Sequence, residues 1–288
     1  MTEQKTYILT VTCPAKTGIV AAITGFLAEQ HCYITEMAQY DDEMTQKFFC
    51  RIMFRPDTVL SPDIGSIRSQ FEEAVASHFT MHWRMTNASR PMRVALMVSK
   101  ADHCLVDLLY RRNKGDLNMD ITCVISNHTD LRSIVEREGI RFICLPVDKT
   151  NKQAQEARML ELVKDTQTEL VVLARYMQIL SDDTCRKLQG MCINIHHSFL
   201  PGFKGARPYH QAFDRGVKLI GATAHYVTSD LDEGPIIEQS VERVDHTYHP
   251  ENLAALGRDL ENSALAKAVK LHTEHRVFVD GNKTVVFK

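Results

Sequence analysis

After residue 91, the chain alternates short apolar segments with stretches of helical length, and this alternation constrains the fold more than any other feature. The apolar segments lie at 93–98, 121–126, 142–146, 170–173 and 192–195. Strands that are joined by helices lie parallel in one sheet, because each helix carries the chain back to the starting edge. The pattern predicts a Rossmann-like, doubly wound and mostly parallel α/β sheet, with a ligand site at the carboxyl ends of its strands.

The first 86 residues follow a different pattern. Strand-like runs at 7–12, 32–40, 47–54 and 79–85 are interrupted by helical segments at 17–29 and after Pro62. This βαββαβ order is typical of a ferredoxin-like fold. A polar stretch follows it. We therefore expect one domain over 1–86, a linker over 87–91 and a second domain over 92–288 that ends in a long helix and a hairpin.

Composition limits the partners of the chain. Its 288 residues are 44% hydrophobic and carry a formal net charge of −2, and they include no apolar run long enough to span a membrane. These values fit a soluble protein with a small-molecule ligand and favour neither nucleic acid nor membrane as a partner. The polar start lacks the layout of a signal peptide, and the eight cysteines are scattered. We expect a cytoplasmic protein with reduced thiols and no disulfides.

One segment places an amide and an imidazole on the same face of a strand. Asn194 and His196 lie two residues apart at the end of an apolar run, and such side chains leave a strand on the same side. Pro201 and two following glycines then favour a loop that covers a site. Asp232 ends a later loop, where its carboxylate can orient His196 and stabilise its cationic form. These three side chains are the candidate catalytic residues.

Each of these residues also has an ordinary structural explanation. His196 and His197 can form a structural pair, while Asn194 can form a turn and Asp232 can cap a loop. Metal-ligand types are present at His196, His197, His210, His225 and Asp232. None of them falls in a spacing typical of a metal motif, so we expect no metal. The combination of amide, imidazole and carboxylate favours catalysis.

The two segments resemble the folate-dependent formyltransferase and hydrolase superfamily, which has an asparagine, a histidine two residues later, S-F-L-P, and a distal L-D-x-G-P. Residues 103–105, 125–128, 173–181 and 220–228 narrow the resemblance to the formyltetrahydrofolate deformylases, and it covers essentially the whole chain. It implies a formyltransferase fold and hydrolysis of 10-formyltetrahydrofolate to formate and tetrahydrofolate, without a required cofactor. It also implies a role in balancing the one-carbon folate pool and in supplying formate for purine synthesis.

The same resemblance implies which residues hold the folate. Backbone groups of 175–180 and of the stretch before Asp232 are expected to contact the pterin. The candidate substrate-binding residues are Arg175, Met177, Gln178, Ile179, Leu180, Ser198, Lys204 and His225. Met177 also fits an ordinary core position. Whether His196 or Asp232 takes the proton of the water is left open.

The N-terminal module resembles an ACT domain. Gly18 lies at its first strand-to-helix turn, where the missing side chain lets backbone N–H groups face a ligand. ACT domains bind small effectors at this turn, commonly amino acids, so the candidate effector-binding residues are Lys16, Thr17, Gly18 and Ile19. The alternative is that Gly18 only permits a tight turn. Because ACT-like sheets pair edge to edge, we expect a homodimer or homotetramer.

Three other functions compete with hydrolysis. The turn at 98–103 lacks the G-x-G-S-N that cradles a phosphate in purine-pathway transformylases. No basic C-terminal domain, as in transfer-RNA formyltransferases, follows the final hairpin. A folate or amino-acid sensor that binds without turnover is the third alternative, and the complete catalytic trio argues against it. Hydrolysis is the favoured function.

Overall fold

The computed structural model describes residues 5–200 and 208–288. By the contacts among its residues, the chain divides into two compact units. The first contains the chain up to Arg90 together with Glu274–Phe278 and Val285–Lys288. The second contains Pro91–Thr273 and Val279–Thr284. The division falls between Arg90 and Pro91, and it assigns to the first unit two C-terminal segments that we expected within a single domain over 92–288.

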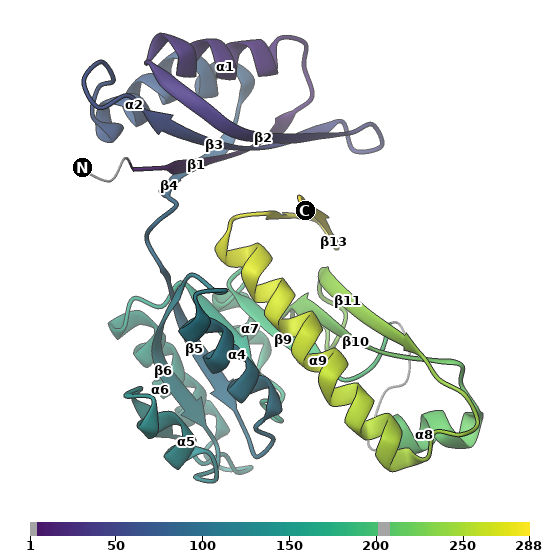
Figure 1. Ribbon diagram of the computed structural model, residues 1–288. Coiled ribbons are helices and arrows are strands. Elements are labelled where there is room, and N and C mark those ends of the chain that lie inside the picture. The colour runs from purple at the N-terminus through teal and green to yellow at the C-terminus, as the bar shows by residue number, and fades with distance from the viewer. Residues whose placement is uncertain (1–4, 201–207) are drawn as a thin grey trace. The chain divides into compact units, whose positions relative to one another are not determined.

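The first unit is a four-stranded antiparallel sheet with helices packed on one face (Figure 1). Its strands run in the order β2-β3-β1-β4 and comprise β1 (Tyr7–Pro14), β2 (Cys32–Asp42), β3 (Lys47–Pro56) and β4 (His82–Asn87). Its helices are α1 (Ile19–Glu29), α2 (Ile64–Phe71), the π-helical turn η1 (Glu72–Ala76) and α3 (Ser77–Phe79). Leu9 and Ile52 of the sheet are fully buried against Ile23 and Phe71 of the helices. The predicted ferredoxin-like, ACT-like fold is confirmed.

The C-terminal residues of the chain complete this first unit. Phe278 and Phe287 pack edge to face, and Phe278 packs in the same way on Phe49 of β3. The buried Arg51 donates a hydrogen bond of 3.0 Å from Nε to the backbone oxygen of Glu274. These apolar and polar contacts explain why the two C-terminal segments belong to the first unit.

The second unit is built on a seven-stranded sheet in the order β11-β10-β9-β8-β5-β6-β7. Its strands are β5 (Met92–Val98), β6 (Met119–Ser126), β7 (Phe142–Cys144), β8 (Leu170–Leu173), β9 (Cys192–His196), β10 (Leu219–Tyr226) and β11 (Ile236–Arg243). Strands β5 to β9 are parallel, whereas β10 pairs antiparallel with both β9 and β11. The predicted doubly wound, mostly parallel sheet is confirmed.

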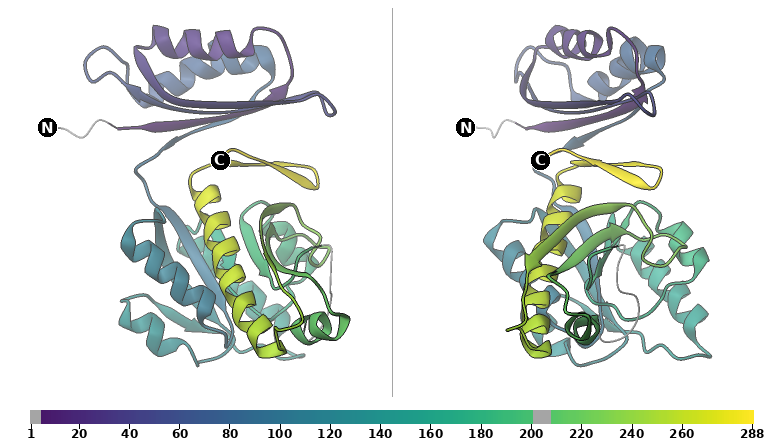
Figure 2. Two further views of the ribbon diagram at one scale, coloured as in Figure 1. Left: turned by 45° about the vertical axis from the view of Figure 1, so that its right-hand side comes forward. Right: turned by 90° about the vertical axis from the view of Figure 1, so that its right-hand side faces the viewer.

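Helices cover both faces of this sheet (Figure 2). They are α4 (His103–Lys114), α5 (Arg132–Arg137), α6 (Lys152–Asp165), α7 (Asp182–Lys187), α8 (Pro208–Arg215) and α9 (Pro250–Thr273). Helices α6 and α7 pack on one face, and α4 and α9 contact each other on the opposite face. No helix within the described ranges is both long enough and apolar enough to cross a membrane. Strands β12 (Val277–Asp280) and β13 (Lys283–Val286) form the expected terminal hairpin.

The direction of the strand order reverses beside β5. The chain proceeds from β5 to β6 and β7 on one side, and then to β8 and β9 on the other. Ligands bind at such a reversal, beyond the carboxyl ends of the strands. The loop after β8 and the last residues of β9 lie at this edge, as the sequence pattern predicted.

All eight cysteines are free thiols, seven of them buried. Burial raises the pKa of Cys50 to about 12. A thiol in such surroundings stays protonated and packs as a small apolar group.

Candidate active site

A cleft of about 240 Å³ opens at the carboxyl ends of β8 and β9. Its walls come from the loop after β8, the end of β9, the end of β10 and the loop that precedes Asp232. Asn194, His196 and Asp232 all line this cleft. The structure therefore brings together the three residues that the sequence singled out.

Asp232 orients the ring of His196. Its Oδ2 lies 3.2 Å from His196 Nδ1, and because a carboxylate only accepts hydrogen bonds, Nδ1 carries the proton. Burial acts to raise the pKa of Asp232, but the hydrogen bond from His196 opposes it, and the pKa lies well below its usual range. In the neutral His196 ring, Nε2 is then left as an acceptor, and this atom is buried without a partner among the described residues.

The loop that carries Asp232 has an unusual backbone conformation. Asp232 itself has a φ of 58°, in the left-handed region that non-glycine residues seldom adopt. Two residues later, a Cβ on Gly234 would lie 1.8 Å from the backbone oxygen of Tyr226. Only glycine allows this close approach, which accounts for the glycine of the L-D-x-G-P pattern. Strain of this kind is found at functional sites, where the surrounding structure maintains it.

Asn194 is oriented by a histidine on the neighbouring strand. Asn194 and His225 are direct partners in the β9–β10 pairing, and Asn194 Nδ2 lies 3.3 Å from His225 Nε2. His225 Nδ1 donates to the backbone oxygen of Tyr226 at 2.9 Å, so Nε2 of the neutral ring accepts from Asn194. The second N–H of the Asn194 amide is left to donate into the cleft.

Exposed apolar side chains form part of the cleft wall. Met177 and Ile179 are 59% and 60% exposed, and Leu231 on the opposite loop is 56% exposed. Side chains of this size are seldom left to water in a group unless they meet a ligand. Met177 is therefore not a core residue, which was the alternative explanation, whereas Leu180 lines the cleft and also belongs to the core.

The structure separates one predicted substrate-binding residue from the others. Arg175, Gln178 and His225 line the cleft with the apolar residues of the wall. Ser198 is buried and does not line it, and its backbone oxygen accepts a hydrogen bond of 3.0 Å from Thr223. Ser198 is thus placed to support the end of β9. Lys204 lies outside the described residues.

The predicted effector turn of the first unit has the expected backbone. Gly18 has a φ of 93°, a conformation that favours glycine, and it precedes α1 directly. Lys16 and Thr17 are exposed beside it. Ile19 differs from the expectation, because its side chain is 2% exposed and belongs to the core of the unit. Its backbone alone can face a ligand.

Two residues of the site had no predicted catalytic or substrate-binding role. His197 lines the cleft, and its Nδ1 lies 2.9 Å from the NH1 atom of Arg175. The Nε atom of Arg175 pairs at 3.3 Å with Oε2 of Glu261, a carboxylate of α9 that is 2% exposed. A sequence signal existed for Glu261, because it lies on the buried face of the helix between Leu260 and Ala264.

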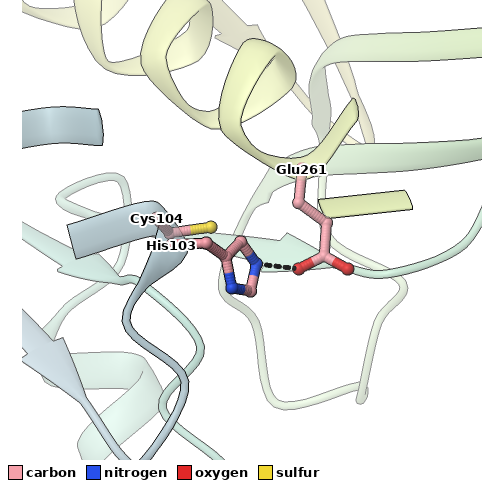
Figure 3. Close-up of side chains that lie close together, drawn as sticks. All are labelled: His103, Cys104 and Glu261. Atoms are coloured by element: carbon pink, nitrogen blue, oxygen red, sulfur yellow. Dashed lines mark hydrogen bonds and ion pairs between the residues drawn. The ribbon is translucent and has the colours of Figure 1, made fainter. Parts of the chain in front are cut away.

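Glu261 also belongs to a group of possible metal ligands with His103 and Cys104 (Figure 3). The ligand atoms of the three lie within 4.8 Å of one another. However, Glu261 already accepts hydrogen bonds from His103 at 2.8 Å and from Tyr209 at 3.0 Å. Burial raises the pKa of the Cys104 thiol, which disfavours a thiolate ligand. With the cation of Arg175 also at the carboxylate, these contacts describe an anchor for Arg175 better than a metal centre.

Comparison with known proteins identifies the class. Residues 92–269 match the family described as formyl transferase. This match spans more than half of the chain, so the chain belongs to the formyl transferase family.

Full-length relatives narrow the assignment. The formyltetrahydrofolate deformylase of Corynebacterium sp. (strain P-1) is 53% identical over 289 residues, which cover 100% of both chains. The crystal structure of the formyltetrahydrofolate deformylase from Burkholderia mallei is 49% identical, with a TM-score of 0.94 over 99% of this chain and 100% of that one. The corresponding structure from Pseudomonas syringae pv. tomato is 49% identical, with a TM-score of 0.95 over 100% and 96% of the two chains. Within its family, the chain belongs to the formyltetrahydrofolate deformylases, as its sequence motifs predicted.

Proposed function

We propose that the chain hydrolyses 10-formyltetrahydrofolate to formate and tetrahydrofolate in the cleft of the second unit. The observation that carries this proposal is the buried Nε2 atom of His196, which has no partner among residues 5–200 and 208–288. Asp232 lies on the other side of the ring and Asn194 on the same strand. The reaction returns tetrahydrofolate to the one-carbon pool and supplies formate for purine synthesis.

His196 acts as the base toward water. Its Nε2 accepts a proton from the water as the water oxygen attacks the formyl carbon, and the same proton then passes to the folate nitrogen as the C–N bond breaks. Asp232 stays ionised and stabilises the cationic ring between the two steps. Proton transfer by a positioned side chain contributes about 10² to 10⁴-fold to such a rate.

Asn194 stabilises the oxyanion. The formyl oxygen becomes negative as the tetrahedral intermediate forms, and the free N–H of the Asn194 amide donates to it. The bond to His225 fixes the amide before the substrate binds, so no reorganisation is needed during the reaction. Removing one such donor costs about 10² to 10³-fold in kcat. Because these side chains supply the base and the oxyanion donor, the reaction requires no cofactor.

The planar part of the folate lies against the apolar wall. Met177 and Ile179 on one loop and Leu231 on another expose apolar surface within the cleft. Gln178 and the backbone of both loops provide polar partners beside that wall. This mixture of apolar surface and a few directed polar groups suits a pterin ring.

The test is formate release from 10-formyltetrahydrofolate in the absence of any amine. The wild-type chain is expected to release formate at a steady rate, and Asn194→Ala, His196→Ala and Asp232→Asn to lose most of that rate. The matched control is His246→Ala, because His246 is an exposed histidine of the same unit that does not line the cleft. Stoichiometric binding of the folate without formate would instead identify a sensor.

We also propose that the turn at Gly18 binds an amino acid connected to one-carbon supply, glycine or methionine, and thereby changes the hydrolysis rate. The exposed turn and the free N–H groups at the start of α1 support a carboxylate site. Gly18→Asp adds a negative charge there, and Gly18→Asn is its neutral control, since both residues tolerate a positive φ. Loss of the response in Gly18→Asp alone is expected, and a flat response of the wild-type chain would contradict the proposal.

The proposal also includes an oligomeric state and a cellular location. A homodimer or homotetramer is expected from edge-to-edge pairing of the first unit, and light scattering at several protein concentrations tests it. A cytoplasmic location is supported by the eight free thiols. Fractionation of cells that express the full chain tests the location.

A further inference from the structure

Hydrolysis places two oxygen atoms on the reacting carbon. One comes from the formyl group and the other from water, whereas transfer to an amine would leave only the first. Asn194 provides a donor for one oxygen. A second donor at the same place would favour water as the acceptor, because it would stabilise an atom that only the hydrolytic intermediate contains.

His197 lies in the right position to provide that donor. It lines the cleft, and its ring stacks on the ring of His196 with a centroid distance of 4.9 Å and an interplanar angle of 21°. The base of the proposed reaction and His197 are therefore neighbours in space as well as in sequence.

The contacts of His197 determine where its proton lies. A guanidinium group only donates hydrogen bonds, so His197 Nδ1 accepts from Arg175 NH1 across 2.9 Å. Burial and, to a smaller extent, the charge of Arg175 lower the pKa of His197 to about 4, so the ring is neutral near pH 7. Its single proton therefore lies on Nε2. This atom is buried, and no described residue accepts its hydrogen bond.

Arg175 is itself held in place. Its guanidinium pairs with the buried Glu261, and Glu261 is fixed by His103 and Tyr209. The backbone φ of Arg175 is 65°, a strained value that the surrounding contacts maintain. An unsatisfied buried N–H costs about 1 to 3 kcal/mol. His197, a residue that lines the cleft, thus keeps a buried donor that no described residue satisfies. The neighbouring Arg175 makes an ion pair with Glu261, although its Nε has no hydrogen-bond partner among the described residues.

We propose that His197 is a further catalytic residue whose Nε2–H binds the water-derived oxygen of the tetrahedral intermediate. This inference rests on the proposed hydrolysis. As the C–O bond forms, His196 takes one proton of the water, and the oxygen retains the other and accepts a hydrogen bond from His197. As the C–N bond breaks, His196 returns its proton to the folate nitrogen. The formic acid that remains loses its proton to solvent.

Two variants test the donor. His197→Phe keeps a planar ring but has no N–H, whereas the amide nitrogen of His197→Gln reaches about as far as Nε2 and can donate. We expect the phenylalanine variant to lose about 10² to 10³-fold in kcat, and the glutamine variant to stay within about tenfold of the wild-type chain. The dissociation constant for tetrahydrofolate, which lacks the formyl group, is expected to change by less than about threefold in both variants, because ligand contact elsewhere is retained.

The outcomes separate the two proposals. If the wild-type chain releases no formate, the proposed hydrolysis fails and this inference fails with it. If the wild-type chain is active and His197→Phe stays within threefold of it, this inference alone is overturned. Equal losses in the phenylalanine and glutamine variants would also overturn it, because a purely structural role does not depend on the N–H.

Discussion

Two sets of buried polar groups, one in each unit, differ in how their hydrogen bonds are satisfied. In the first unit, the Arg51 side chain is 2% exposed, and it donates to Glu36 at 2.9 Å and to the Glu274 carbonyl at 3.0 Å. In the second unit, the Nε2 atoms of His196 and His197 are buried and have no partner among the described residues. A satisfied buried charge holds a fold together, whereas an unsatisfied buried nitrogen is a cost that a ligand can remove. Arg51 is thus a structural polar group, whereas the two histidine nitrogens can serve a ligand.

The largest expected effect is on catalysis. His196→Ala should lower kcat for formate release by about 10³-fold, within the range for loss of a positioned base. It should lower the thermal midpoint by the equivalent of about 1 to 3 kcal/mol, because the bond from Nδ1 to Asp232 is lost. Paired kinetics and calorimetry measure both. A drop in thermal midpoint as large as that of a core substitution would contradict the distinction between His196 and the structural group Arg51.

The second effect is on stability. Arg51→Ala should lower the free energy of unfolding of the first unit by about 3 kcal/mol, because two charge-assisted hydrogen bonds are lost, with kcat unchanged. Chemical denaturation followed by circular dichroism measures the change. Arg84→Ala is the control, since Arg84 is an exposed arginine in the same sheet. Equal losses in the two variants would contradict the role of Arg51.

An intermediate effect is expected at Glu261, which is well satisfied but supports the site. Glu261→Gln removes the charge that faces Arg175 and should cost about tenfold in kcat together with about 1 to 2 kcal/mol of stability, the worth of a charge-assisted contact. Asp259→Asn, an exposed carboxylate on the same helix, is the control. An effect on kcat alone would place Glu261 with the chemical groups, and an effect on stability alone would place it with the structural groups.

The smallest effect is a pH dependence. The pKa of His197 is about 4 in the folded chain, whereas an ordinary histidine has a pKa of 6.5. Between these two pH values, the unfolded chain therefore binds more protons than the folded chain. The stability that neutral His197 contributes is complete above pH 6.5 and is lost as the pH falls toward 4. From pH 7 to pH 5, we expect a loss of about 1 kcal/mol, reduced for partial exposure.

Thermal unfolding of the wild-type chain and of His197→Gln at these two pH values measures this loss. The range ends at pH 5 because the pKa values of Asp232 and Glu261 are lowered in the fold, so both carboxylates titrate below it. The glutamine variant has no titrating group at this position and should show the smaller loss. Identical losses of stability in the wild-type chain and in His197→Gln would show that His197 does not cause the pH dependence.

Much of the fold could be predicted from local sequence patterns. Apolar segments of strand length with helix-length gaps predicted the sheet of the second unit, because burial on both faces leaves continuous apolar runs such as 170–173. Alternation and the turn at Gly18 predicted the first unit in the same way. The pair Asn194 and His196 was readable because both lie on one strand, where spacing determines direction.

The remaining features depend on distant pairings. Glu261 meets His103 across 158 positions of sequence, and Arg51 meets Glu274 across 223. No local periodicity of the sequence indicates such contacts. The proton position on His197 was beyond the sequence for the same reason, because it follows from where Arg175 places its guanidinium. For that reason the sequence indicated a histidine pair but not what the second histidine contributes.

The C-terminal segments that complete the first unit have a consequence for protein synthesis. The sheet of residues 7–87 is synthesised long before the aromatic and carbonyl partners of Phe49 and Arg51, which lie within 274–287. The N-terminal unit therefore gains these contacts only after residues 274–287 have left the ribosome. A substitution within 274–287 acts first on a sheet that is distant from it in sequence.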